Sequence, residues 1–219
     1  MGQKIRPDSY RLGIYKNWNS RWFAKKSFKH SLEEDVLIRK IIKEKIGNAG
    51  IDKIEVEKSD KNYRVYIKVA KPGLVIGRGG KGIDDLKTLL EKNLNKLFKE
   101  RGVETKININ LNIEELKRSE ASAAVLAQNI AWDLEKRMPF RRTMKKALMA
   151  VMQNREVGGA KIKLSGRLDG NEISRREWLG KGKLPLQTLR SNIDYGTATA
   201  FCTYGAVGIK VWIYKGENV

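Results

Sequence analysis

The sequence predicts an α+β fold in two parts, and three observations support it. In the first half, the spacing of apolar residues is helical in some segments and alternating in others, which predicts the order helix, strand, strand, helix, strand. In the second half, two helical stretches precede four strand-like stretches, as expected for two helices packed on a mostly antiparallel four-stranded sheet. Hydrophobic residues make up 41% of the chain, which is enough for one core or two small ones.

Residues 1–30 are expected to form a basic, aromatic extension without a core of its own. They hold eight basic residues, one acid and several interleaved aromatic residues, and apolar periodicity is absent. Such a segment suits RNA, because cations contact phosphates and aromatic rings stack on bases. The alternative is a partly disordered tail whose rings pack on the domain. The candidate RNA contacts here are Lys4, Arg6 and Arg11.

Residues 31–114 are expected to form the first domain, which begins with a helix. Ser31 followed by Glu34 is typical of a capping box at a helix N-terminus. Apolar residues then recur at helical spacing as far as Ile46, and Gly47 ends the run.

The rest of this domain alternates between strand and helix patterns. Residues 51–56 and 63–69 predict two paired strands. Apolar residues from Ile83 to Leu97 form a helical stripe, and residues 106–113 alternate strictly, which predicts a third strand.

A glycine-rich loop lies between the second strand and the helical stripe, and it contains Gly77, Arg78, Gly79, Gly80 and Lys81. Glycine lets the backbone bend sharply and lets another backbone approach closely. The helix that follows begins with outward-pointing N–H groups, where a phosphate binds readily. This pattern favours a grip on a phosphodiester backbone over a simple surface turn.

The same glycines also fit the dinucleotide fingerprint G-x-G-x-x-G, through Gly77, Gly79 and Gly82. That fingerprint follows directly from a strand, whereas here residues 71–76 intervene. We therefore regard a dinucleotide site as a weak alternative.

The loop and its flanks resemble the V-I-G-x-x-G-x-x-I signature of KH domains, whose glycine loop clamps about four nucleotides of single-stranded RNA. With the element order above, the resemblance implies a type II KH domain, α-β-β-α-α-β. Many relatives carry two lysines between the outer glycines, where this chain has Arg78 and Gly79. One cation fewer implies a weaker grip on phosphate.

Residues 115–219 are expected to form a second α+β domain. A helix is predicted over residues 119–137, Pro139 breaks it, and a second helix is predicted over residues 140–156. The second helix carries one contiguous cationic patch, because its basic residues are spaced i, i+1, i+4 and i+5: Arg141, Arg142, Lys145 and Lys146. An ordinary solvated helix face is the alternative, but no acid interrupts the run.

Strands of the second domain are predicted near residues 160–164, 171–179, 188–199 and 207–213, with glycine-marked hairpin loops at 166–170 and 180–183. Basic residues on these strands and loops are further candidate RNA contacts: Lys161, Lys163, Arg167, Arg175 and Arg176.

The composition points to a polyanionic partner. The 219 residues carry 45 Lys and Arg against 25 Asp and Glu, a formal net charge of +20. No apolar run is long enough to span a bilayer, and no signal peptide or myristoylation motif is visible, so no membrane contact is expected. One cysteine, Cys202, suits a reducing cytosol, and with the single His30 it offers no zinc spacing and no motif for a nucleophile. We expect no cofactor and no metal.

Short blocks spread over the whole chain, in order, resemble the bacterial small-subunit ribosomal protein three family. They are residues 1–4, 11–14, 22–23, 64–83, 140–142, 165–168, 177–178, 184–186, 203–205 and 208–213.

This resemblance implies a structural protein of the small-subunit head in the cytoplasmic ribosome, with no enzymatic activity. It implies binding to 16S-type rRNA and to mRNA, with ribosomal proteins ten and fourteen as neighbours. It also implies that Arg141, Arg142 and Lys145, continued by Lys146, face incoming mRNA and support its unwinding. A free KH-containing RNA regulator or RNase adaptor is the alternative.

Overall fold

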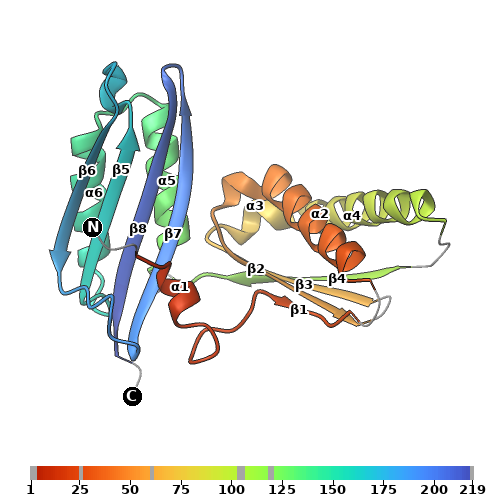
Figure 1. Ribbon diagram of the computed structural model, residues 1–219. Helices are drawn as coiled ribbons and strands as arrows, with labels where there is room; N and C mark the ends of the chain where they lie inside the picture. The colour runs from red at the N-terminus through yellow and green to blue at the C-terminus, as the bar shows by residue number, and fades with distance from the viewer. Residues whose placement is uncertain (1–3, 25–26, 60–61, 103–106, 118–120, 218–219) are drawn as a thin grey trace. The chain divides into compact units, whose positions relative to one another are not determined.

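The computed structural model describes residues 4–24, 27–59, 62–102, 107–117 and 121–217, and it forms two compact units (Figure 1). One unit is Trp18–Leu116. The other joins the residues before Trp18 to those after Leu116. The predicted boundaries after residues 30 and 114 therefore differ from this division, because the first part of the expected extension belongs to the C-terminal unit.

The unit Trp18–Leu116 has the predicted order α-β-β-α-α-β and is a KH domain of the α+β class. Its sheet has the order β1-β2-β3-β4, in which β2 pairs antiparallel with β3 while β4 and β1 pair parallel to their neighbours. Its elements are β1 (Ser20–Arg21), α2 (Phe28–Ile46), η1 (Gly47–Ala49), β2 (Ile51–Ser59), β3 (Asn62–Val69), α3 (Pro72–Ile76), η2 (Arg78–Gly80), α4 (Lys81–Glu100) and β4 (Asn108–Glu115).

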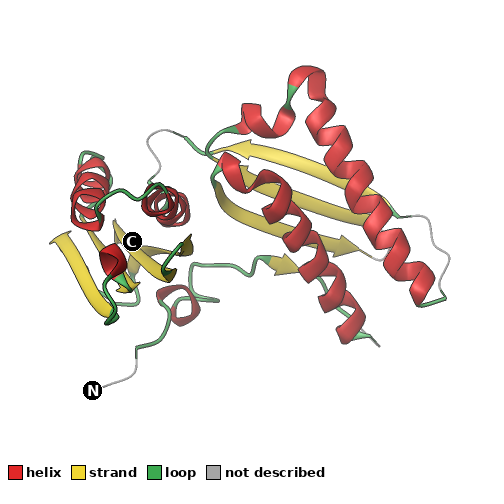
Figure 2. Ribbon diagram, turned by 90° about the horizontal axis from the view of Figure 1, so that it is seen from above, coloured by secondary structure: helices red, strands yellow, loops and turns green. Residues whose placement is uncertain are grey.

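Helices α2 and α4 cover one face of this sheet (Figure 2). Ile38 and Ile42 of α2 meet Leu90 and Leu94 of α4 in one core cluster, and none of the four is exposed to solvent. The four-residue spacing of these side chains keeps them on one side of each helix. The predicted apolar stripe is thus confirmed at its centre.

The predicted capping box at Ser31 is wrong, because α2 begins three residues earlier, at Phe28. Ser31 lies inside the helix and its Oγ accepts a hydrogen bond from Lys58 Nζ at 3.1 Å. Glu34, the expected capping partner, is buried, and its carboxylate accepts hydrogen bonds from Lys58, from Tyr63 Oη at 2.7 Å and from Arg101 Nη1 at 2.7 Å. The serine–glutamate spacing therefore marks a buried ionic network and not a helix end.

Strand β1 was not visible in the sequence pattern, because only two residues pair with β2. Arg39 of α2 holds it in place: its guanidinium donates to Asp35 on its own helix, to the Ile54 carbonyl at 2.6 Å and to the Asn19 carbonyl at 2.9 Å. Ser20 Oγ donates to Asp35 Oδ2 at 2.8 Å. Side chains of α2 therefore fix this short edge strand, which makes few backbone hydrogen bonds of its own.

The C-terminal unit packs two helices on a four-stranded sheet, as predicted. The sheet order is β6-β5-β8-β7, and every neighbouring pair is antiparallel. The elements are α1 (Pro7–Tyr10), α5 (Ala123–Glu135), α6 (Phe140–Met152), β5 (Gly159–Gly166), η3 (Leu168–Gly170), β6 (Arg175–Gly182), β7 (Ser191–Cys202) and β8 (Gly205–Glu217). The expected hairpin loop at residues 180–183 is largely wrong, because β6 continues to Gly182.

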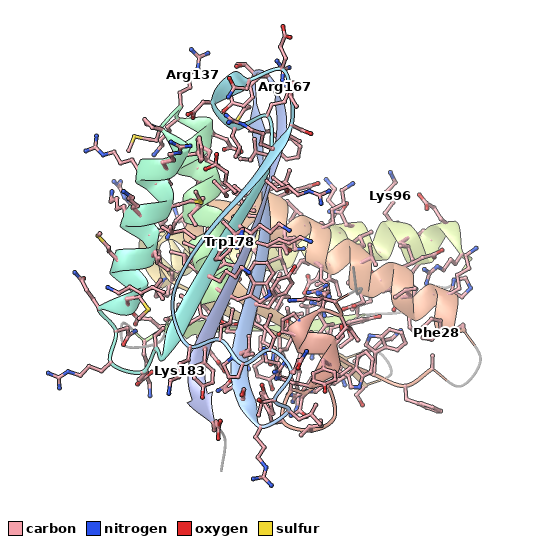
Figure 3. All side chains as sticks on the ribbon, turned by 60° about the vertical axis from the view of Figure 1, so that its left-hand side comes forward. Phe28, Lys96, Arg137, Arg167, Trp178 and Lys183 are labelled. Atoms are coloured by element: carbon pink, nitrogen blue, oxygen red, sulfur yellow. The ribbon has the colours of Figure 1, made fainter. Side chains whose placement is uncertain are left out.

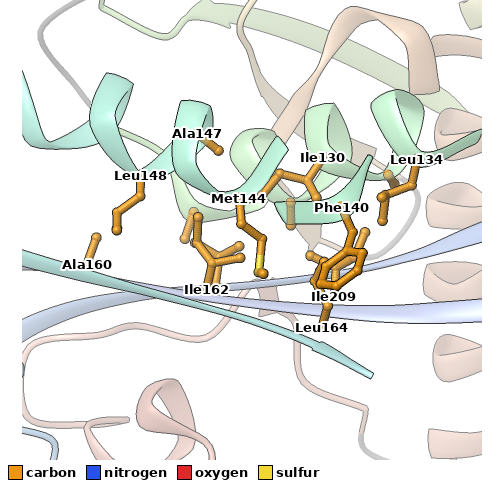
Figure 4. Packing of buried hydrophobic residues seen from close by; sticks show 14 of the residues in the cluster. Ile130, Leu134, Phe140, Met144, Ala147, Leu148, Ala160, Ile162, Leu164 and Ile209 are labelled. Atoms are coloured by element: carbon orange, nitrogen blue, oxygen red, sulfur yellow. The ribbon is translucent and has the colours of Figure 1, made fainter. Parts of the chain in front are cut away.

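Both helices lie on the same face of this sheet, and their apolar sides fill the space between (Figure 4). Phe140, Met144 and Leu148 of α6 pack over Ile162 and Leu164 of β5.

Helix α5 approaches β7 so closely that Gly196 is required. A Cβ atom at Gly196 would lie 2.3 Å from the Ala123 carbonyl oxygen. The side chain of Ser122 caps this helix by accepting from the Val125 N–H.

Arg11 attaches the N-terminal segment to the C-terminal unit. Its side chain is fully buried. The guanidinium donates to the carbonyls of Ser191 at 2.8 Å, Thr188 at 2.8 Å and Leu186 at 2.9 Å, and also to Pro7 at 3.2 Å. A planar group with five donors satisfies several carbonyls at once, so this one side chain organises the loop before β7.

Candidate nucleic-acid interface

The glycine loop has the backbone that its sequence predicts. Gly77, Gly79 and Gly80 have φ of +69°, +63° and +80°, a region that favours glycine. Arg78 and Lys81 are exposed, and neither forms a salt bridge with a described carboxylate. Gly80 is the N-cap of the 20-residue helix α4, so N–H groups of the first turn point toward the loop, although that of Lys81 donates to the Arg78 carbonyl. The loop therefore presents two cations and a helix N-terminus at one place.

The glycine that allows close backbone approach is Gly82, which the sequence had suggested only as part of the dinucleotide alternative. A Cβ atom there would lie 2.4 Å from the carbonyl oxygen of Val75 in α3. At Gly79 and Gly80 the corresponding positions are open. Because α3 separates β3 from the loop, the dinucleotide fingerprint lacks the strand that it requires.

Helix α6 presents the predicted cationic face. Phe140, Met144, Ala147, Leu148 and Val151 are buried on its inner side. On the outer side the four basic residues are exposed: Arg141, Arg142, Lys145 and Lys146. The helical period of about 3.6 residues places the apolar residues on one side and the basic residues on the other.

An open groove of about 830 Å³ runs between α6 and strand β6. The four basic residues of α6 line one wall together with Met149, and Glu177, Trp178 and Leu179 of β6 line the other. Glu177 is the carboxylate of this lining, and its Oε2 lies 3.5 Å from Arg141 Nε. The groove is therefore strongly cationic, although the charge of Arg141 is partly balanced.

The remaining candidate contacts differ in exposure. Lys4, Arg6, Arg175 and Arg176 are exposed, and Lys161 and Lys163 are half-buried on β5.

The structure corrects one predicted RNA contact, Arg11, and shows a further role for a second, Arg167. Arg11 is fully buried in the hydrogen bonds described above, so it is not accessible to RNA. Arg167 is partly buried, and its guanidinium donates to the carbonyls of Asn171 at 3.0 Å, Tyr204 at 3.1 Å and Gly170 at 3.3 Å. These hydrogen bonds stabilise the turn after β5, so Arg167 has a structural role, and its contact with RNA stays a prediction.

Comparison with known families agrees with both units. Residues 37–121 match the family model described as KH domain. Residues 130–213 match the model described as Ribosomal protein S3, C-terminal domain.

Curated relatives match nearly the full length of the chain. The small ribosomal subunit protein uS3 of Caldicellulosiruptor saccharolyticus is 49% identical, over 99% of this chain and 93% of its own length. The proteins of the same name from Syntrophomonas wolfei and Clostridium botulinum (strain Okra) are each 46% identical over 99% of this chain, and over 90% and 93% of their own lengths. The chain belongs to the uS3 family.

The uS3 family consists of structural proteins of the small ribosomal subunit and is not a family of enzymes. A KH domain joined to an S3 C-terminal domain implies binding to rRNA. Within the residues that the structure describes, no helix combines the length and the apolar character needed to cross a membrane.

Sequence reasoning missed two residues of the α6 groove, Glu177 and Trp178. They are distant from α6 in the chain, so only the pairing of β6 with β5 brings them beside it. Two signals were available: residues 177–178 form one of the blocks that resemble the family, and Trp178 is a large aromatic residue among polar ones in a strand-like segment.

Proposed function

We propose that this uS3-family chain binds small-subunit rRNA and lines the entrance of the mRNA channel with helix α6. As a member of the family it is a constituent of the small subunit, and its location is the cytoplasmic ribosome. The observation that carries the mRNA proposal is the exposed row of Arg141, Arg142, Lys145 and Lys146 beside an open groove. An interface for single-stranded RNA needs such a cationic track.

The mechanism is electrostatic. Cations on α6 hold the phosphates of an mRNA strand that has separated from its complement, which makes re-pairing less favourable. Arg141 and Arg142 offer planar donors that suit phosphate oxygens, whereas Lys145 and Lys146 act as point charges. Movement of mRNA through the ribosome supplies the work, so the protein hydrolyses nothing.

Replacing Arg141, Arg142 and Lys145 with alanine tests this proposal. All three side chains are exposed, so the fold should be preserved. We expect ribosomes with this variant to translate mRNAs that contain stable hairpins several-fold more slowly, while their rate on unstructured mRNA stays the same. Single-ribosome or bulk elongation assays measure both rates.

A charge-matched control separates this role from the general effect of lost charge. Lys43, Lys45 and Lys96 are exposed cations of the KH unit, and their triple alanine variant loses the same charge. This control should translate hairpins at the normal rate. Equal rates for the α6 variant and the control on hairpin mRNAs would contradict the proposal.

We also propose that the glycine loop of the KH unit contacts RNA phosphates. The double change Arg78→Asp and Gly79→Asp places anions at the loop, and Asp tolerates the positive φ of position 79, where a Cβ meets no neighbour. The matched control is Arg78→Asn with Gly79→Asn, which has the same shape without the charge. RNA affinity should fall in the order wild type, Asn pair, Asp pair. Identical affinities of the two pairs would exclude the loop as a phosphate clamp.

We propose ribosomal proteins ten and fourteen as protein neighbours in the subunit head, supported by membership of the uS3 family. Chemical cross-linking of purified small subunits, followed by mass spectrometry, should yield links from this chain to both. Links to other ribosomal proteins only would contradict the assignment.

A further inference from the structure

The C-terminal sheet has a second surface that the proposal above leaves unassigned. Helices α5 and α6 cover one face, and strand register determines which residues point to the other, here called the outer face. Since Ile162, Leu164, Val211 and Gly196 face the helices, their neighbours along each strand face away. The outer face of the two central strands and β6 therefore carries Lys161, Lys163, Ser165, Arg176, Trp178, Lys210 and Trp212.

This outer face is cationic without compensation. Lys163 lies directly opposite Lys210 across β5 and β8 and directly opposite Trp178 across β5 and β6. Directly opposed like charges destabilise a sheet, so their presence points to a partner of opposite charge. Among the described residues, no carboxylate forms a salt bridge with Lys161, Lys163 or Lys210. Burial, followed by the charges of Lys4 and Lys163, lowers the pKa of Lys161, in agreement with crowding of positive charge.

Aromatic rings lie among these lysines. Lys161 Nζ lies 4.4 Å from the ring centre of Trp178 and 6.0 Å from that of Trp212, and the rings of Trp212 and Tyr195 are 5.4 Å apart. Trp178 is 63% exposed, which leaves one of the largest apolar side chains in contact with water. Figure 3 labels it midway along β6, between Arg167 and Lys183. An exposed aromatic ring beside cations offers a surface on which a base can stack.

The N-terminal segment packs against β7 on the outer face, where the Arg6 guanidinium also lies 5.4 Å from the ring centre of Tyr195. Tyr15 Oη contacts the Ser191 carbonyl and accepts from the Ile193 N–H at 3.2 Å, and Ile193 is fully buried. These contacts are on β7. At the opposite side, β6 is the edge strand and Trp178 also borders the α6 groove. The outer face and the α6 groove therefore meet along β6.

We propose that the outer face of the C-terminal sheet binds an unpaired RNA segment, with a base stacked on Trp178 and phosphates on Lys163 and Lys210. A four-stranded sheet with aromatic residues and cations on its open face provides both contacts that single-stranded RNA requires. Among the described residues, strands β5, β6 and β8 place no carboxylate on this face, so its charge complements phosphate, and its exposed ring suits a base rather than an acidic peptide. This inference rests on RNA binding by the chain and adds a base-contacting residue that is distinct from the α6 cations.

The first test separates base stacking from charge. The full-length chain and its Trp178→Ala variant are titrated with a short unstructured RNA and with an abasic ribose-phosphate strand of the same length. We expect the substitution to weaken RNA binding about fivefold or more and to leave binding of the abasic strand unchanged, since only stacking is removed. Trp178→Phe should restore most of the affinity.

Two controls keep the outcomes distinct. Ile173→Ala removes an apolar side chain that is 79% exposed in the same unit but precedes β6, and it should change neither affinity. If Trp178→Ala weakens binding of the RNA and of the abasic strand equally, or weakens neither, the proposed stacking of a base on Trp178 is wrong. If the α6 triple variant still lowers affinity for both strands, the proposed function stands independently of this result.

The second test identifies the occupant in the assembled particle. A photoreactive benzoylphenylalanine replaces Trp178, and purified small subunits are irradiated. Cross-links to RNA nucleotides support the proposal. Cross-links exclusively to protein would show that the face is a protein interface and would overturn it.

Discussion

At the scale of single residues, burial decides what a charge does. Arg11 and Arg141 are the same amino acid, and both lie in segments with more basic than acidic residues. Arg11 is fully buried, and its guanidinium donates hydrogen bonds to backbone carbonyls. The side chain of Arg141, in contrast, is 74% exposed beside the α6 groove. Charge patterns along a sequence cannot distinguish these cases, because all the carbonyl partners of Arg11 except Pro7 lie more than 170 positions away.

The first residue-scale prediction concerns this buried guanidinium. Arg11→Ala should destabilise the C-terminal unit by about 3 kcal/mol, because it leaves several buried carbonyls without a donor and opens a cavity. Arg11→Lys should recover little of this, since an ammonium group cannot reach the same set of carbonyls.

Urea unfolding measures the change in stability, and chymotrypsin cleavage after Tyr10 or Tyr15 should become faster. Arg6→Ala is the matched control, because that side chain is 65% exposed. Equal stability of the Arg6 and Arg11 variants would contradict the anchoring role.

The second residue-scale prediction concerns Glu34 of the KH unit. Glu34→Ala leaves Lys58 and Arg101 without their buried partner, and it should cost about 3 kcal/mol of unfolding free energy. Glu33 also contacts Arg101, with 2.7 Å between Arg101 Nη2 and Glu33 Oε2, but its side chain is exposed. Glu33→Ala should therefore have little effect on stability, as denaturant titration can show.

Glu34 also predicts a dependence on pH. Burial by itself raises the pKa of Glu34, but hydrogen bonds from Lys58, Tyr63 and Arg101 outweigh it, so the pKa lies below its usual value of 4.5. The unfolded chain then binds this proton more readily than the folded one. The contribution of Glu34 to stability is present above pH 4.5 and is lost as pH falls through the lowered pKa. Glu34→Gln should flatten the acid side of the stability curve, and an unchanged curve would contradict the argument.

At the scale of elements, the chain depends on close contacts between backbones. Gly82→Ala would place Cβ against the Val75 carbonyl, so α3 and α4 must separate. We expect a loss of about 1–3 kcal/mol in the stability of the KH unit, together with weaker RNA binding by the loop.

Gly73→Ala is the control within α3, since a Cβ there meets nothing within 4 Å and alanine favours a helix. Thermal unfolding compares the two variants. The argument about backbone approach would be wrong if Gly73→Ala were as destabilising as Gly82→Ala.

Most elements could be predicted from the sequence, because apolar periodicity is strong where a helix or strand covers a core. The α4 stripe and the alternating strand β4 are examples. Elements fixed by distant side chains could not be predicted. Strand β1 depends on hydrogen bonds from Arg39. The start of α2 could not be predicted because Ser31 and Glu34, which resemble a capping pair, form hydrogen bonds with Lys58 and Tyr63 inside the unit.

The candidate site divides in the same way. The α6 cations and the glycine loop are local patterns, so their placement was predictable. Glu177 and Trp178 join the α6 groove only through strand pairing, and the outer face of the sheet exists only when four separate segments are in register. No local pattern contains that information.

At the scale of the whole molecule, charge sets the strength of association with RNA. A formal net charge of +20 predicts affinity that falls steeply with salt, because each neutralised phosphate releases counterions. Removing three α6 cations should lower the slope of log K against log salt by up to about 2 for single-stranded RNA. Filter binding at several salt concentrations measures the slope, and a flat response would contradict an electrostatic mode.

The position of Arg11 has a consequence for synthesis. Its acceptor on Ser191 follows 180 residues later, so the segment around Arg11 leaves the ribosome long before its binding site is synthesised. The whole KH unit emerges in between and contains its own core. The amino-terminal segment must therefore wait undocked on the nascent chain while the domain behind it folds, and its docking should be among the last events in maturation.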